Sequence, residues 1–295
     1  MKKFGFLIVL LFFLLACQKD YNKTKHAYQF IPKQTSAVIK VNELNDFISS
    51  IENHDILSGI YNKELKNASE VLKNLNTTKQ VYIAFPNSLE KNSDYLILTE
   101  NDTTLFVVDS IPNHISETLT EFKIEKSQIN TTIVYHKIIG NIFVGSNNLD
   151  VLNSLDYKKE SSDLTRLLET TDKKSVASIV FKVDSPNYSK LLFSNIANDD
   201  NSEFSVLDIG YTDNSLIYNG ILTSKDSITN NLDSFKNTIP QQTNTTNLAP
   251  SKTASMLSIT YDDFLVFNKN LLQLKTQDVD STQTFLNFTN EIALI

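Results

Sequence analysis

The first seventeen residues constrain this 295-residue chain more than any other stretch. Lys2 and Lys3 precede twelve residues without a charge, Phe4 to Leu15, and Ala16 then stands directly before Cys17. A positive start, a short apolar run and a small residue at its end are the features of a secretory signal peptide. The apolar run is shorter than the roughly 20 residues that a membrane-spanning helix needs. The sequence therefore predicts that residues 1–16 are a cleaved leader.

Leu14-Leu15-Ala16-Cys17 resembles the lipobox of bacterial lipoprotein signals. The resemblance implies cleavage after Ala16, a diacylglycerol on the Cys17 sulfur and an acylated (palmitate-type) amine, and hence a lipid anchor in the outer membrane. Lys19-Asp20 resembles the start of the surface-export signal of Bacteroidota lipoproteins, in which a lysine precedes two acidic residues; Tyr21 stands where the second acid is expected. Both the cell surface and the periplasmic face of the outer membrane therefore remain open as locations.

Composition excludes several classes of function. Cys17 is the single cysteine, so the mature chain has no disulfide, cysteine zinc cluster or cysteine nucleophile. Loss of Lys2 and Lys3 leaves 25 basic against 34 acidic residues, a net charge of about −9. A chain this acidic, with Arg166 as its single arginine, lacks the clustered cations that bind nucleic acid or anionic lipid. We therefore expect no nucleic-acid partner, and attachment to the membrane through the lipid alone.

Hydrophobic periodicity predicts an α+β fold with antiparallel sheet and helices packed on one face. Alternating, β-branched runs predict strands at 36–41, 80–85, 95–98, 104–108, 132–139, 142–145, 176–183, 204–211 and 216–222. Helical spacing is found at 43–51, 56–75, from Pro112 through Phe122, and at 149–155, 164–168, 188–196 and 228–235. Gly140-Asn141 is typical of a two-residue hairpin loop.

The pattern also predicts how the chain is divided. Residues 17–28 are polar and predict a tether, 29–238 form the α+β domain, and 239–247 form an uncharged polar linker. Residues 248–265 then echo 30–48: Pro-x-x-Thr, a strand and Asp-Phe recur, which predicts an internal β-α repeat. Residues 248–295 are a partial second copy. Either the sequence is a fragment of a longer repeat protein, or this part packs on the preceding domain.

Two segments carry a family resemblance. Ile31-Pro32 through Asn42, with the following Asp46-Phe47, and Gly140 through Leu152 resemble the extracytoplasmic proteins of domain-of-unknown-function family 3352. Those proteins open with Pro-Ala-Asp-Thr-Ala and a strand, and place a hairpin before a short helix; Gln34 stands here in place of the Asp. The resemblance covers about half of the chain. It implies a fold and an envelope location, and no catalytic residues.

The residue types that carry chemistry do not form a known constellation. His26, His54, His114 and His136 have no i, i+4 zinc spacing. Asp278-Val279-Asp280 resembles the front of a calcium loop, but the loop glycine and distal glutamate are missing. Asp199-Asp200 and Asp262-Asp263 stand where carboxylates cap helices. No Gly-x-Ser-x-Gly elbow, Gly-x-Gly-x-x-Gly or P-loop occurs. We predict no catalytic, metal or cofactor-binding residue.

These observations predict a lipid-anchored cell-envelope protein with a binding or scaffolding role and no catalysis. Two alternatives remain: an envelope hydrolase that uses carboxylates, and the accessory lipoprotein of an outer-membrane complex. A convergent pocket with carboxylates of perturbed pKa would favour the hydrolase. A broad exposed apolar patch would favour a partner-binding protein.

Overall fold

A computed structural model describes residues 26–53, 63–86, 94–106, 115–119, 124–155, 162–182, 202–212, 215–224, 231–274 and 284–295. They divide into two compact units, one within 1–178 and 208–217, the other within 179–207 and 218–295. No helix in this part of the chain is long and apolar enough to cross a membrane.

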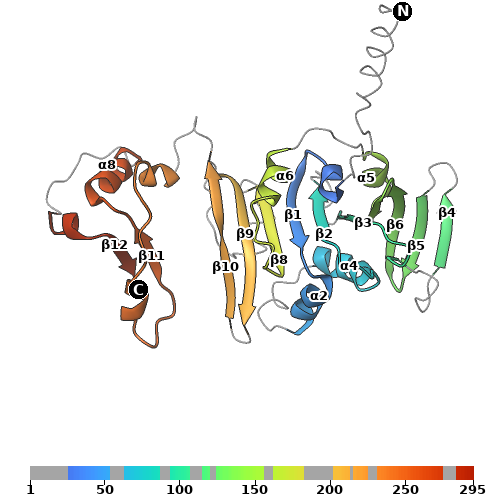
Figure 1. The fold of residues 1–295 in the computed structure, drawn as a ribbon, viewed down its shortest axis with the longest axis horizontal. Coiled ribbons are helices and arrows are strands. Elements are labelled where there is room, and N and C mark those ends of the chain that lie inside the picture. The colour runs from blue at the N-terminus through green and yellow to red at the C-terminus, as the bar shows by residue number, and fades with distance from the viewer. Residues whose placement is uncertain are drawn as a thin grey trace, which may run out of the picture. The chain divides into compact units, whose positions relative to one another are not determined.

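Ten strands form one sheet, in the order β10-β9-β8-β1-β2-β3-β7-β6-β5-β4 (Figure 1). Their bounds are β1 Thr35–Val41, β2 Val81–Pro86, β3 Leu96–Glu100, β4 Ile115–Leu119, β5 Ile124–Ile129, β6 Thr132–Ile139, β7 Ile142–Ser146, β8 Ala177–Lys182, β9 Ser202–Thr212 and β10 Ser215–Ser224. Every pair from β1 through β4 in that order is antiparallel. With five α-helices among the described residues, this confirms the α+β class. The structure does not show the internal repeat, which stays a prediction.

β1 is buried along its whole length, as a strand in the middle of a sheet requires. Ala37, Val38, Ile39 and Val41 supply its apolar side chains. The core continues with the buried residues 81–85 of β2 and 96–98 of β3. The short helix η1 (Ala27–Phe30) precedes β1 and buries Ala27 and Phe30. Within the described residues, burial therefore begins at residue 27.

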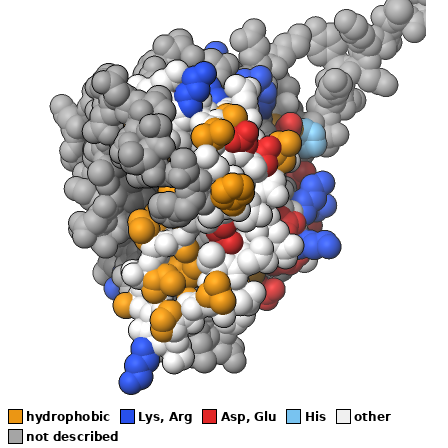
Figure 2. All heavy atoms as spheres, turned by 90° about the vertical axis from the view of Figure 1, so that its left-hand side faces the viewer, with side chains coloured by type: hydrophobic (Ala, Val, Ile, Leu, Met, Phe, Trp, Pro, Cys, Tyr) orange, Lys and Arg blue, Asp and Glu red, His pale blue; other side chains and the backbone are white. Residues whose placement is uncertain are grey.

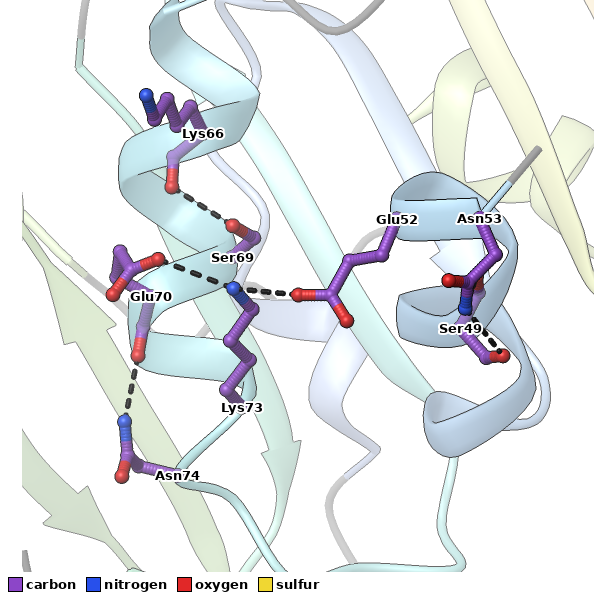
Figure 3. Close-up of polar contacts among 8 residues, drawn as sticks. All are labelled: Ser49, Glu52, Asn53, Lys66, Ser69, Glu70, Lys73 and Asn74. Carbon is purple, nitrogen blue, oxygen red and sulfur yellow. Dashed lines mark hydrogen bonds and ion pairs between the residues drawn. The ribbon is translucent and has the colours of Figure 1, made fainter. Parts of the chain in front are cut away.

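Two helices come together beside the strands in the first unit. α2 (Leu44–Asn53) buries Leu44, Phe47 and Ile51, and α4 (Lys63–Leu72) follows it and contacts β6. The Lys73 ammonium lies 2.7 Å from Glu52 on α2 and 3.2 Å from Glu70 on α4, so it bridges the two helices (Figure 3). The other α-helices in the described part of this unit are α5 (Leu149–Asn153) and α6 (Asp163–Leu168).

Several predicted elements are confirmed and three are not. The hairpin at Gly140-Asn141 is present, with Gly140 at φ 66° between β6 and β7. The helix predicted from Pro112 through Phe122 is wrong, because Ile115–Leu119 is strand β4, paired with β5. The strand predicted at 104–108 is wrong at residues 104–106. Thr104 lies in a turn, in which its N–H donates to Asp102 Oδ1, and the next two residues are not in a strand. The helix predicted at 228–235 is a 3-10 turn, η3 (Asn231–Phe235). The helix predicted at 188–196 lies outside the described residues.

Residues 231–295, here called the C-terminal subdomain, form a small arrangement within the second unit. Its elements are η3, η4 (Thr245–Leu248), β11 (Leu257–Thr260), α8 (Phe264–Leu274), η5 (Thr284–Phe288) and β12 (Glu291–Leu294). β11 and β12 pair antiparallel as a two-stranded sheet. Its core is Tyr261, Phe264 and Phe267, with Ile259, Leu271, Leu286 and Ile292 packed around them.

Candidate functional site

Cys17 and Ala16, the predicted lipidation and cleavage residues, lie outside the described residues. Among the described residues, which begin at His26, the first buried side chain is that of Ala27. Ten residues of extended chain reach at most about 35 Å. An acyl group on Cys17 would therefore hold the first packed residue within about 35 Å of the bilayer surface.

The two histidines in the described part of the chain, His26 and His136, lie in different elements. His26 stacks on the Tyr28 ring at a centroid distance of 5.4 Å, and His136 lies on β6 more than a hundred residues away. His54 and His114 lie outside the described residues, as do Asp199-Asp200 and the calcium-like stretch from Asp278. Within the described ranges, no group of three His, Cys, Asp or Glu side chains is placed to hold a metal ion.

His136 forms a buried polar pair with a serine that the sequence does not single out. Ser127 Oγ lies 2.9 Å from His136 Nε2, and Glu125 Oε2 lies 3.8 Å from the same nitrogen. In a serine hydrolase the carboxylate orients the imidazole through the other ring nitrogen. Ser127 is fully buried, and the His136 ring packs against Phe106 and Phe143. The arrangement therefore ties β5 to β6 and does not present a nucleophile to a substrate.

A second polar group surrounds the buried side chain of Lys40 on β1. Its ammonium donates to Thr171 Oγ1 at 2.9 Å and to the Leu168 carbonyl at 3.3 Å, at the C-terminal end of α6. Burial lowers the pKa of Lys40, and Lys173 adds to this effect, while Asp208 and Glu169 oppose it. The contacts of the ammonium are neutral oxygens of the protein, which makes Lys40 a structural tie between β1 and the end of α6.

Asn42 extends this network to the neighbouring strand. Its amide donates to the carbonyls of Asp172 and Ser175, and its side-chain oxygen accepts from Gln80 Nε2 at 2.9 Å. Gln80 in turn accepts from the Tyr82 hydroxyl at 3.0 Å. The chain of bonds joins β1, β2 and the loop before β8. It holds the backbone in place and leaves these donors and acceptors engaged with the protein itself.

The capping expectation is confirmed for one aspartate of the pair in the C-terminal subdomain. Asp263 Oδ1 accepts from the main-chain N–H groups of Leu265 and Val266 at 2.8 and 3.2 Å, at the start of α8. Asp262 Oδ1 instead accepts from the Ile239 N–H at 2.8 Å. The two carboxylates have different partners, so they are not a catalytic pair.

Residues 239–245, within the predicted linker, are bonded to the β11–β12 sheet. The Gln241 N–H donates to Thr260 Oγ1 at 3.4 Å, and the Thr243 hydroxyl lies 3.3 Å from Ser258 Oγ. The Glu291 carboxylate on β12 accepts from the hydroxyls of Thr243, Thr245 and Ser258 and from the Asn244 N–H. Desolvation raises the pKa of Glu291, but these hydrogen bonds outweigh it and hold that pKa well below its usual range. Glu291 therefore stays ionised and clamps this segment on the sheet.

The C-terminal subdomain carries many exposed large hydrophobic side chains. Fifteen large hydrophobic side chains are exposed in the described part of the chain, and eight of them lie between residues 231 and 295. They are Phe235, Ile239, Leu248, Leu257, Leu265, Phe288, Leu294 and Ile295. Figure 2 shows apolar side chains gathered in several groups over one face of the molecule, with polar side chains between them. Exposed large apolar side chains are therefore concentrated in this part of the described chain.

Comparison with known proteins leaves the family open. No family model matches the chain, and no curated protein matches it. A solved structure described as "Structure of crystal form III of TP0453" aligns with a TM-score of 0.38 and 13% identity over 72% of this chain and 85% of that one. A TM-score of this size does not establish a shared fold. Membership of family 3352 therefore stays a prediction.

The sequence could not reveal the residues that proved most informative. Ser127, Lys40 and Glu291 stand in no motif. The partners of Lys40 and Glu291 lie far along the chain, and Ser127 meets His136 only because β5 pairs with β6. The exposed apolar residues of 231–295 carry a weak signal. Leu257 and Leu294 look like ordinary strand residues, and only the burial of the structure distinguishes them from core positions.

Proposed function

We propose that the chain is a lipid-anchored protein of the cell envelope that binds or scaffolds another macromolecule. Leu14 through Cys17 support the anchor, because the lipobox pattern ends on the single cysteine of the chain. The tether is short, and attachment by two or more acyl chains is stable without a basic patch. We place the protein on the outer membrane, at either of its faces.

The observation that carries the binding role is the apolar surface of the C-terminal subdomain. Phe288 is 93% exposed and Leu248 77%, in a region whose own core buries three aromatic side chains. Exposing such residues to water is unfavourable unless a partner covers them. Among the carboxyls of the described residues, Asp102 and Glu291 have lowered pKa values, whereas a general acid needs a raised one, so these two residues do not favour the hydrolase alternative.

Acylation is tested on the full chain and on Cys17→Ala, expressed in a bacterium that processes lipoproteins. We expect labelled palmitate to enter the wild-type chain and the protein to fractionate with membranes, whereas Cys17→Ala takes up no label. A wild-type chain without label, or a label that persists in Cys17→Ala, would refute the anchor. The wild-type chain is then purified from membranes through a C-terminal tag, with Cys17→Ala treated in parallel. This tests whether a stoichiometric partner accompanies the anchored form.

A further inference from the structure

Residues 239–245, here called the strap, run alongside β11 in the opposite direction. Every second residue of the strap meets every second residue of the facing segment. The three contacts are Ile239 N–H to Asp262 Oδ1 at 2.8 Å, Gln241 N–H to Thr260 Oγ1 at 3.4 Å, and Thr243 Oγ1 to Ser258 Oγ at 3.3 Å. A step of two residues is that of an extended chain. The strap therefore follows β11 as an extended, antiparallel segment.

The sheet meets the strap with side-chain oxygens. Thr260 on β11 and Glu291 on β12 are cross-strand partners, so their side chains share one face of the sheet. The Glu291 carboxylate accepts from the N–H groups of Asn244 and Thr245 at 2.8 and 3.2 Å, and from the hydroxyls of Thr243 and Thr245. These contacts recognise an extended backbone and short hydroxyl side chains. We call the side chains of Ser258, Thr260, Asp262 and Glu291 the polar row.

The strap contributes no buried side chain to the C-terminal subdomain. None of residues 239–245 is buried, and Ile239 is 64% exposed. The aromatic core lies on the opposite face of the sheet, where Ile259 and Ile292 pack against it. Segments held by exposed hydrogen bonds and few apolar contacts open locally, without unfolding of the core. The strap can therefore leave the polar row while the core stays intact.

The chain before the strap is held by contacts of its own. The Phe235 ring lies against the Phe267 ring of α8 at a centroid distance of 5.4 Å, and Asn270 Nδ2 donates to the Lys236 carbonyl at 2.7 Å. Opening of the strap thus leaves η3 docked on α8. The strap stays near the polar row at an effective concentration on the order of millimolar, which a competing segment must overcome.

We propose that the polar row is a binding site for an extended, uncharged polypeptide segment rich in threonine and asparagine, which the strap occupies in cis. The strap itself defines the occupant, because its sequence, Ile-Pro-Gln-Gln-Thr-Asn-Thr, carries no charge and supplies the hydroxyl and N–H donors that the polar row accepts. A segment of this kind from another polypeptide displaces the strap. The inference names a class of partner for the binding role proposed above and rests on that role.

The test uses residues 17–295 with Cys17→Ala, the mature polypeptide without its anchor. Thr243→Val with Thr245→Val removes two hydroxyl donors of the strap at nearly unchanged side-chain shape. Hydrogen exchange at the main-chain amides of Asn244 and Thr245 should become at least about tenfold faster in this double variant. The Phe267 amide, which donates to the Asp263 carbonyl in α8, should keep its protection and shows that the core is folded.

The probe is the peptide acetyl-Thr-Ile-Pro-Gln-Gln-Thr-Asn-Thr-Thr-amide, which copies residues 238–246. It should bind the double variant, and the chain with its native strap at least about tenfold more weakly, because that strap competes. Glu291→Gln, added to the double variant, should weaken binding at least about tenfold, whereas Glu117→Gln on β4 should not. A peptide with valine at the positions of Thr243 and Thr245 should lose affinity similarly, which covers the case in which Glu291→Gln fails to fold.

Four results would overturn the proposal. Strap amides that exchange no faster in the double variant show that the strap is not detachable. A double variant with fast exchange that does not bind the peptide shows that the polar row is not a site. Binding that is equal with and without Glu291, or equal for the valine peptide, places the peptide elsewhere. A dimer of the chain with its native strap that the two valines abolish assigns the site to a second copy. None of these results depends on acylation of Cys17, so failure of this site and failure of the anchor are separate results.

Discussion

Lys73 on the α4 side and Glu52 on α2 form an ion pair with an N···O distance of 2.7 Å, which fixes the spacing of the two helices. The pair is partly solvent-exposed, so Lys73→Ala should lower the free energy of unfolding by at most about 1 kcal/mol, and by less in high salt. The hydrogen bond with Glu52 raises the pKa of Lys73. The contribution of the Lys73–Glu52 ion pair to the free energy of unfolding is therefore present at neutral pH and is lost as the pH rises beyond 10.5.

Urea unfolding at low and high salt measures this effect. Lys79→Ala is the control, because Lys79 lies 3.8 Å from Glu100 and is 63% exposed. It should leave the stability unchanged. Equal losses in the two variants, or a loss at Lys73 that salt does not reduce, would contradict the prediction.

Lys40 should be replaceable by an apolar side chain of similar length, since its ammonium is buried among neutral oxygens. Lys40→Met removes a desolvated charge, and Thr171 Oγ1 still donates to the Leu168 carbonyl at 2.8 Å. We expect a stability within about 1 kcal/mol of the wild type or above it. Lys40→Ala leaves a cavity and should cost about 2 kcal/mol or more. Equal destabilisation by both substitutions would show that the charge itself is required.

The pH dependence provides a second measure of Lys40. Burial lowers the pKa of its amine below 10.5, so at pH values just below 10.5 the unfolded chain binds more protons than the folded chain. The wild type should therefore gain stability as the pH rises through that window. Lys40→Met should remove part of this gain, as seen by urea unfolding between about pH 8.5 and 10. Identical slopes for the two proteins would contradict the shift.

Tyr95→Phe should stabilise the protein, because the Tyr95 side chain is fully buried and its hydroxyl has no hydrogen-bond partner within the described structure. Removing an unsatisfied buried hydroxyl should raise the free energy of unfolding by about 1 kcal/mol. Tyr82→Phe is the matched control, since the Tyr82 hydroxyl donates to Gln80 and its loss should cost about 1 kcal/mol. Thermal unfolding of the two variants should show shifts of opposite sign. Shifts of the same sign would refute the conclusion that the Tyr95 hydroxyl lacks a hydrogen-bond partner.

Glu291→Gln should release residues 239–245 from the β11–β12 sheet, because an amide accepts fewer hydrogen bonds than a carboxylate. The change should appear as faster hydrogen exchange at the main-chain amides of Asn244 and Thr245, which donate to Glu291. Glu117→Gln on β4 should leave their exchange unaltered. The lowered pKa of Glu291 also predicts that the wild-type amides stay protected when the pH falls below 4.5. Loss of protection at pH 4.5 would contradict the clamp.

The sequence predicts most strands of the sheet, including β9 and β10 at one end of its order, and fails at the other end, at β4 and β5. β1, β6 and β7 are rich in β-branched residues, and Gly140 marks the turn between the last two, so local pattern is sufficient there. β4 and β5 lie at one end of the sheet order, and the buried residues of β5, Ile124, Ser127 and Ile129, do not alternate regularly along the strand. Ile115 and Leu119 stand four residues apart, which is also helical spacing. Pairing with a neighbouring strand decides the outcome, and a single segment does not contain that information.

In the candidate sites, too, the roles that depend on neighbouring residues could be predicted and those that depend on distant residues could not. Asp263 as a helix cap follows from its position before an apolar run, because capping depends on neighbouring residues. The bonding of residues 239–245 to the β11–β12 sheet could not be predicted, because an uncharged polar stretch is typical of a linker. The carboxylate that holds Thr243 through Thr245 stands 46 to 48 residues further on, on β12.

Asn42 gives the fold a particular order of assembly. Its amide reaches carbonyls 130 and 133 residues further on, and its N–H donates to the Val176 carbonyl. β1 thus lies between an early neighbour, β2, and a late one, β8. A chain released N-terminus first leaves one edge of β1 bare until residue 176 has emerged. Long-range pairing of this kind is slow, and bare strand edges aggregate in the interval. A chaperone that shields this edge of β1 during that interval would protect the chain from aggregation.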